Sequence, residues 1–264
     1  MDQPLLVARE GAVALLTLNR PEVRNALSPW LYAELEQAVR ALGHDPEVRC
    51  LVITGQGDAF CSGDDVKQTF GAGAPGASAA AEALAREPRL TPAADALLRC
   101  PVPVVAAVNG PAVGWGMELA LMADLRVASE RARFGELFVL RGLCCDVAGL
   151  ARLAQLVGRE KAAELLYTGA LIDAAEALRI GLVSRVVAPE RVVDEALALA
   201  ERIAANPPLA VRALKAGLAR ALDPDWDELG RWVSASLAEL FRSEDHREGV
   251  RAFLEKRAPR FTGR

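Results

Sequence analysis

One segment, Val104–Asp124, constrains the fold of this chain more than any other. It opens with a continuous run of valines and alanines over 104–108, the pattern of a strand buried on both faces. A glycine-rich turn over 109–116 breaks the run, and good helix formers follow from residue 117. A helix that starts directly after a buried strand presents free backbone N–H groups at its positive end. The segment therefore predicts an anion site at this turn.

A carboxylate, Glu118, falls in the first turn of that predicted helix. Acid–base chemistry on a developing oxyanion is one reason to keep a negative charge beside an anion site. The structural alternative is a glutamate that only complements the helix dipole. A second glycine turn, Ala59–Lys67, follows another buried strand, Cys50–Thr54. Two such turns can direct two N–H groups at one oxygen, which favours the catalytic interpretation.

Composition excludes several classes of protein. A chain of 264 residues can bury a large core, as one domain with an appendage. Its net charge of −4 predicts no nucleic-acid partner, because such binding needs a basic face. No apolar run reaches the roughly 18 residues of a membrane span, and no signal peptide is recognised. Five cysteines and two histidines without metal-ligand spacing predict no metal site, and reduced thiols predict a cytoplasmic protein.

Strand and helix patterns alternate over the first half of the chain. Leu5–Arg9 and Ala12–Leu18 read as the two strands of a hairpin. Ser28 is a predicted N-cap before Pro29 at the first helical position, and Gly43 is expected to close that helix. The alternation predicts an α/β architecture.

Two further regions are defined less by period than by composition. Residues 70–90 carry few anchors and are interpreted either as a mobile surface loop, with a weak helix over 79–86, or as an active-site lid. From residue 190 onward the pattern is helical, with breaks at prolines. The apolar faces of these helices predict packing against partner subunits as well as against the chain's own core.

An ordered set of motifs covers nearly the whole chain and resembles the enoyl-CoA hydratase/isomerase (crotonase) superfamily. The matching segments are Leu18–Pro21, Asn25–Leu27, Phe60–Asp65, Asn109–Asp124, Arg133–Gly135, Gly142–Leu143, Leu153, Gly158, Gly181–Val183 and Phe253–Arg257. The resemblance implies a spiral of β-β-α units over residues 1–188, followed by a helical oligomerisation region over 189–264. It also implies an acyl-CoA substrate, no cofactor apart from the coenzyme A of that substrate, and a homotrimer or a hexamer of two trimers.

The resemblance assigns roles to individual positions. The backbone N–H groups of Asp64 and Trp115 correspond to an oxyanion hole for the thioester carbonyl. The positions that correspond to coenzyme A or substrate binding are Arg24, Ala26, Ser62, Asp65, Val66, Gly114, Phe138, Phe253 and Lys256. Phe253 and Lys256 match positions that reach coenzyme A in a neighbouring subunit. The structural alternatives are a core aromatic for Phe253 and solvated charges for Lys256 and Arg24. Trp115 stands where the family usually has glycine, so we expect a narrowed pocket and small or flat acyl groups.

Phe138 decides which chemistry the resemblance implies. Typical hydratases of the family carry a second catalytic glutamate here, so that two carboxylates hold the water that is added; phenylalanine cannot activate water. Asp146, eight residues farther on, matches a catalytic aspartate of several isomerases of the superfamily. With Glu118 serving carbon 2 and Asp146 serving carbon 4 or beyond, the residues favour double-bond isomerisation. Glu136 is near Phe138 but is expected to point elsewhere if this segment is helical, because residues two apart on a helix lie on different faces.

Some assignments have more than one interpretation. Asp146 is also a suitable N-cap for a helix over 147–156. Overall similarity favours an enoyl-CoA hydratase of the fatty acid β-oxidation type, since one glutamate can retain slow hydration. The resemblance is also compatible with a hydrolase, a decarboxylase or a non-catalytic acyl-CoA-binding member. The thiols of Cys144 and Cys145 have no histidine near them in sequence and are not expected to act as nucleophiles.

Overall fold

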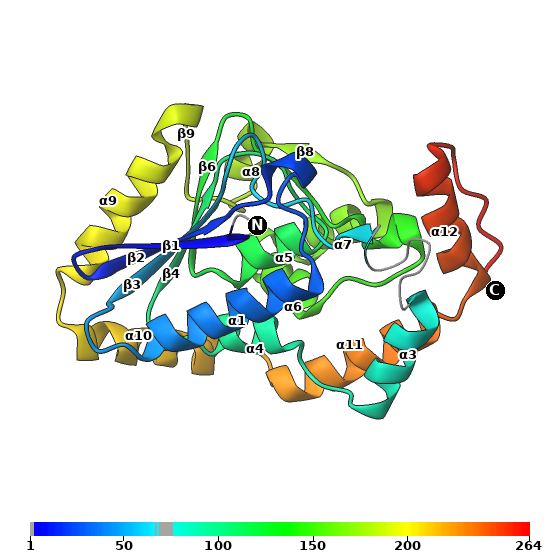
Figure 1. Cartoon of the computed structure of the whole chain (residues 1–264), viewed down its shortest axis with the longest axis horizontal. Helices are drawn as coiled ribbons and strands as arrows, with labels where there is room; N and C mark the ends of the chain where they lie inside the picture. Colours follow the sequence, from blue (N-terminus) through cyan, green and yellow to red (C-terminus); the bar gives the residue numbers. More distant parts are fainter. Residues whose placement is uncertain (1–2, 67, 69–75) are drawn as a thin grey trace.

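The computed structural model describes residues 3–66, 68 and 76–264 and shows a two-sheet α/β fold followed by helices (Figure 1). The larger sheet has the order β1-β2-β3-β4-β6-β9, in which only β1 and β2 are antiparallel. Its strands are β1 (Leu5–Glu10), β2 (Val13–Leu18), β3 (Cys50–Gly55), β4 (Val104–Val108), β6 (Leu125–Ser129) and β9 (Arg185–Val187). The smaller sheet has the order β5-β7-β8, formed by β5 (Ala112–Val113), β7 (Arg133–Gly135) and β8 (Ile172–Asp173).

Helices cover both faces of the larger sheet, which explains why its central strands are apolar throughout. The helices are α1 (Pro29–His44), α3 (Gly76–Arg86), α4 (Pro92–Leu98), α5 (Trp115–Met122), α6 (Val147–Val157), α7 (Arg159–Thr168), α8 (Ala174–Arg179), α9 (Val192–Ala204), α10 (Pro208–Leu222), α11 (Trp226–Leu240) and α12 (Glu244–Glu255). Short 3₁₀ turns add η1 (Pro21–Val23), η2 (Leu137–Arg141) and η3 (Pro189–Arg191). Every residue of β3 and β4 is buried, as the continuous apolar runs predict.

Alternate residues of β3 and β4 belong to two separate cores. Ile53 and Ala106 face the large core that also contains α1 and α5. Val52 and Ala107 face a smaller core under α9, whose alanines repeat every four residues. In Figure 1, α9 lies along one side of the sheet, whereas α3, α11 and α12 extend away from it. The helix α9 therefore covers one face of the sheet of its own chain, although it lies in the region expected to form the oligomer.

Most predicted elements agree with the structure to within one or two residues, and one boundary was wrong for a physical reason. Ser28 caps α1 by accepting from the N–H of Leu31, as expected. However, α1 continues through Gly43 to His44. A Cβ at Gly43 would lie 3.1 Å from the Sγ of Cys100, so this glycine allows close packing and does not end the helix. None of the helices in the described part of the chain is long and apolar enough to cross a bilayer.

Candidate active site

The two glycine turns identified in the sequence lie against each other. The N–H of Cys61 donates to the carbonyl of Pro111 at 3.1 Å, and the N–H of Val113 donates to the carbonyl of Cys61 at 3.1 Å. A Cβ at Gly116 would lie only 2.1 Å from the Cys61 carbonyl oxygen, and one at Gly63 would lie 2.9 Å from that of Val113. The glycines are therefore required because one backbone packs directly on the other.

Two backbone N–H groups are available where these turns meet. Trp115 is the first residue of α5, and Gly114 before it has a φ of 54°, a conformation that favours glycine. The nitrogen of Trp115 lies 3.1 Å from the Cβ position of Gly63, the neighbour of Asp64. In the described part of the chain, neither the Trp115 nor the Asp64 N–H donates to a backbone acceptor. Such a pair can stabilise one oxyanion at the positive end of α5.

Glu118 lies beneath this junction and is fully buried. Its Oε2 accepts a hydrogen bond from the N–H of Gly149, at 3.0 Å, in the first turn of α6. A Cβ at Gly149 would lie 2.6 Å from Oε1 of Glu118, so this glycine makes the space that the carboxyl occupies. Burial raises the pKa of Glu118 well above its usual range, and the charges of Glu136 and Asp146 raise it further. A raised pKa suits a group that exchanges protons near neutral pH.

The expectation for Glu136 depended on a helical segment, and this condition is not met. Glu136 precedes the 3₁₀ turn η2 with φ −87° and ψ 83°, so the helical-face argument does not apply to it. Its side chain is buried, its charge acts on Glu118, and burial raises its own pKa well above the usual range. Local sequence could not reveal this neighbour, because β7 and η2 bring it to α5 only through tertiary packing.

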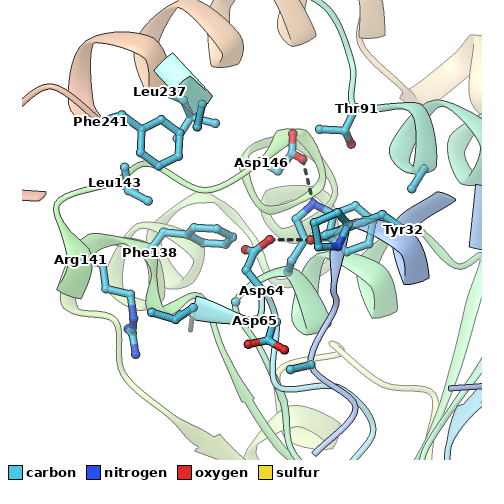
Figure 2. Close-up of a pocket in the computed structure, with 18 of the residues that line it drawn as sticks. Tyr32, Asp64, Asp65, Thr91, Phe138, Arg141, Leu143, Asp146, Leu237 and Phe241 are labelled. Carbon is cyan, nitrogen blue, oxygen red and sulfur yellow. Dashed lines mark hydrogen bonds between the residues drawn. The ribbon is translucent and has the colours of Figure 1, made fainter. Parts of the chain in front are cut away.

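Asp146 is the N-cap that one interpretation of the sequence expected, and its catalytic role stays a prediction. It caps α6, with Oδ1 accepting from the N–H of Val147 at 2.8 Å, and its Oδ2 accepts from the indole N–H of Trp115 at 3.1 Å. The Trp115 ring packs edge-on against Tyr32, with centroids 4.7 Å apart, and the Tyr32 hydroxyl donates to Asp64 at 2.8 Å. Figure 2 shows, among the residues that line a pocket, the hydrogen bond that Asp146 accepts from the indole and the one that Asp64 accepts from Tyr32.

Burial controls the ionisation of Asp64 and Asp146. It raises the pKa of Asp146, which the N–H groups of Val147 and Trp115 hold down in part. Burial also raises the pKa of Asp64, and the charge of Asp146 adds to this, whereas the Tyr32 hydroxyl and the backbone N–H of Asp64 itself oppose it. Burial therefore disfavours the charged forms of Asp64 and Asp146, which both line the pocket.

The pocket has a volume of about 750 Å³ and contains most of the predicted binding positions. The predicted residues that line it are Ala26, Ser62, Asp64, Asp65, Val66, Gly114, Trp115, Phe138, Asp146 and Phe253. Glu118 is fully buried and is not among the residues that line the pocket. Arg24 and Lys256 are exposed and outside the lining, so the structure does not bring these two cations into the pocket.

Sequence reasoning missed the residues that close the pocket at η2. The Arg141 guanidinium lies 4.5 Å from the ring centre of Phe253, and His246 donates from Nδ1 to the Arg141 carbonyl at 2.8 Å. Arg141 also donates to the Leu137 carbonyl at 3.0 Å, and burial lowers its pKa. Phe253 thus lines the pocket of its own chain, and its expected contact with a neighbouring subunit stays a prediction. More than one hundred residues separate Arg141 from Phe253, so no local motif could pair them.

The proposed lid is helical where it is described. Helix α3 packs against α11 and lines the pocket with Ala80, Ala83 and Leu84 (Figure 1). The part of this segment over 70–75 lies outside the described residues. The description as a lid stays a prediction, whereas the weak helix expected over 79–86 is confirmed and begins at Gly76.

Together these features define a class of enzyme. Two backbone donors can hold the oxygen of a polarised carbonyl, buried carboxyls can move protons next to it, and a deep apolar pocket can accept the rest of the substrate. The fold narrows this class further when the chain is compared with known proteins.

The model of the enoyl-CoA hydratase/isomerase family matches residues 8–264. A probable enoyl-CoA hydratase of Rhizobium meliloti is 39% identical over 262 residues, 99% of each chain. A crotonyl-CoA hydratase of Syntrophomonas wolfei is 38% identical over 97% of each chain. The crystal structure of an enoyl-CoA hydratase/isomerase from Pseudoalteromonas atlantica superposes with a TM-score of 0.87 at 33% identity, covering 98% of this chain and all of that one.

The chain belongs to the enoyl-CoA hydratase/isomerase (crotonase) family and is an enzyme of that family. Its fold is crotonase-like, with two sheets and C-terminal helices, as the resemblance predicted. The leaning toward isomerisation has less support, because these two relatives are named hydratases.

Proposed function

We propose that this enzyme hydrates short 2-enoyl-CoA thioesters. The observation that carries the proposal is the pair of N–H groups on Asp64 and Trp115, with the buried Glu118 in the first turn of the helix that Trp115 begins. The thioester oxygen lies between the two donors, which stabilise the enolate. One good donor contributes about 3–4 kcal/mol. Glu118 is three residues along α5 from Trp115, roughly 5 Å along the helix axis, so it serves carbon 2 of the acyl group.

The pocket residues divide the acyl-CoA into two parts. We assign the acyl group to the side lined by Trp115 and Phe138, whose rings favour short or flat chains. We assign the coenzyme to the side lined by Ala26, Ser62 and Val66, with the exposed Arg24 close by in the chain. The names of the relatives, one of them a crotonyl-CoA hydratase, support a short acyl group.

Double-bond isomerisation is the second candidate, and one observation favours it. Asp146 lines the pocket, which Glu118 does not, and it is held by the indole N–H of Trp115. A carboxyl here could take the proton from carbon 4 while Glu118 supplies one to carbon 2.

Mass spectrometry in heavy water separates the two reactions. The purified enzyme is incubated with 2-enoyl-CoA and 3-enoyl-CoA substrates of four to ten carbons. We expect addition of one whole water to the 2-enoyl substrates, fastest at four carbons. Deuterium incorporation with migration of the double bond and no added water would replace hydration by isomerisation. Tight binding without either change would identify a non-catalytic acyl-CoA-binding protein.

We also propose that the chain assembles as a homotrimer, or as a hexamer of two trimers, in the cytoplasm. Its five cysteines are free thiols, as the reducing cytoplasm would keep them. Helix α10 has no buried residue and exposes a row of leucines: Leu209, Leu214, Leu218 and Leu222 are 61–80% exposed. An apolar face of this kind is typical of an interface between subunits.

The double substitution Leu214→Asp with Leu218→Asp tests this assembly. Burial of a leucine contributes about 1.5–3 kcal/mol, so loss of two per subunit with added charge should dissociate the oligomer. We expect light scattering to fall to the mass of one chain, 28.1 kDa. Leu178→Asp, at an exposed leucine on α8, serves as the control and should keep the assembly. An unchanged mass in the double variant would move the interface away from α10.

A further inference from the structure

Three buried carboxyl oxygens next to the reaction site have no hydrogen-bond partner in the described part of the chain. They are Oε1 of Glu118 and both side-chain oxygens of Glu136. A buried acceptor that is left unpaired is destabilising, and more so if it is charged. The charge of Glu136 also acts on Glu118, so two ionised glutamates would be costly here, and one proton shared by them removes most of that cost.

Hydrogen bonding decides which glutamate keeps the negative charge. Oε2 of Glu118 accepts from the N–H of Gly149, and the N–H of Ala148 also faces it. Both N–H groups belong to the first turn of α6, whose dipole favours an anion. Among the described residues, none donates to either oxygen of Glu136. The anion is therefore more stable on Glu118, and the proton belongs to Glu136.

Among the described titratable groups around Glu118 and Glu136, none supplies a positive charge that could compensate two ionised carboxyls. Asp146 at the start of α6 is a third acid, and its oxygens are bonded to Val147 and Trp115. Burial raises the pKa of the Cys145 thiol well above its usual range and that of Cys144 to about 11, which keeps both neutral. Among the described groups whose charges act on Glu118 and Glu136, none is a cation. Only protonation can then relieve the repulsion.

We propose that Glu136 is protonated at neutral pH and donates its hydroxyl to Oε1 of Glu118, so that the two glutamates hold one proton and one negative charge. Glu136 acts as a positioning residue, because it orients Glu118 and does not line the pocket. Glu118 and Glu136 together would hold one proton, as two catalytic glutamates would. Phe138 occupies the position where the family usually has the second of these glutamates. The catalytic consequence of the shared proton rests on the proposed hydration.

The proton balance of hydration is closed by this pair. The water oxygen forms a bond to carbon 3 while one water proton passes to the carboxylate of Glu118. The proton delivered to carbon 2 comes from the same pair, so the carbon–carbon double bond becomes single. The pair ends the cycle with one proton, as it began.

The sign of the pH dependence follows from this assignment. At low pH Glu118 gains a proton and the base is lost; at high pH Glu136 loses its proton and the donor to Glu118 is lost. Activity should therefore fall on both sides of a central range. In Glu136→Gln the amide still donates but cannot ionise, so the alkaline fall should disappear while the acid fall stays.

Infrared spectroscopy tests the protonation without any substrate. At pH 7 we expect the absorbance of the carboxylic-acid carbonyl band to be smaller in Glu136→Gln than in the wild type, by the amount of one protonated carboxyl group. Glu130→Gln, at an exposed glutamate, is the matched control and should leave the band intact. An unchanged band in Glu136→Gln overturns the proposal even if the enzyme hydrates enoyl-CoA.

Kinetics test the positioning role separately. Glu136→Leu, which removes the donor, should lower kcat at least 30-fold with little change in KM. Glu136→Gln should recover at least tenfold of that loss and lack the alkaline fall. If Glu136→Leu does not fold, the Gln profile alone decides. If the activity of Glu136→Gln falls at high pH as that of the wild type does, the proposal is contradicted. If the wild-type enzyme does not hydrate enoyl-CoA but Glu136→Gln still loses carboxylic-acid absorbance, only the proposed reaction is rejected.

Discussion

Glu118→Gln is expected to lower kcat by about 10²–10⁴-fold, the usual contribution of a positioned general acid–base. The amide has nearly the same shape and can still accept from the N–H of Gly149, which lies 3.0 Å from the present Oε2. It cannot take a proton from water or deliver one to carbon 2. Because the substrate is held by the pocket and by backbone donors, the Kd for an acyl-CoA should change less than threefold.

Steady-state kinetics with a four-carbon 2-enoyl-CoA, and calorimetric titration with a saturated acyl-CoA, measure the two quantities. Glu130→Gln again serves as the control, since this exposed side chain does not line the pocket and carries the same chemical change. Turnover within tenfold of the wild type in Glu118→Gln would mean that another carboxyl moves the proton. Asp146 would then be the next residue to replace, since it lines the pocket.

Gly116→Ala is expected to have the second large effect, on both stability and activity. The new Cβ would lie 2.1 Å from the carbonyl oxygen and 2.7 Å from the carbonyl carbon of Cys61. These are backbone atoms, so the contact can be relieved only by moving the two turns apart. Overpacking of this kind costs about 1–3 kcal/mol, and loss of one oxyanion donor lowers kcat by about 10²–10³-fold.

Urea unfolding and steady-state kinetics check the two parts of this prediction. Gly217→Ala in α10 is the control, because a Cβ there meets no atom within 4 Å. Alanine in a helix interior should raise the free energy of unfolding of that variant by about 0.5–1 kcal/mol. If Gly116→Ala kept both wild-type stability and turnover, the close contact between the turns would not be needed for the site.

The elements of the fold could be predicted because their signals are local. The apolar run Val104–Val108 could only be a buried strand, and capping at Ser28 and Asp146 placed the starts of two helices. The spiral arrangement came from the resemblance and not from spacing. Gly43 misled, because a glycine that allows packing and a glycine that ends a helix look the same in sequence.

The sequence by itself located the two carboxyls that we propose for the chemistry, since Glu118 and Asp146 stand in recognisable turns at the starts of α5 and α6. Only the tertiary structure decided that Glu136 joins them, because its side chain is directed by the backbone before η2 and not by a helical period. The same holds for the pairing of Arg141 with Phe253 and for the link from Asp64 through Tyr32. Contacts between distant segments depend on how the buried elements pack, and no local pattern of residues records that packing.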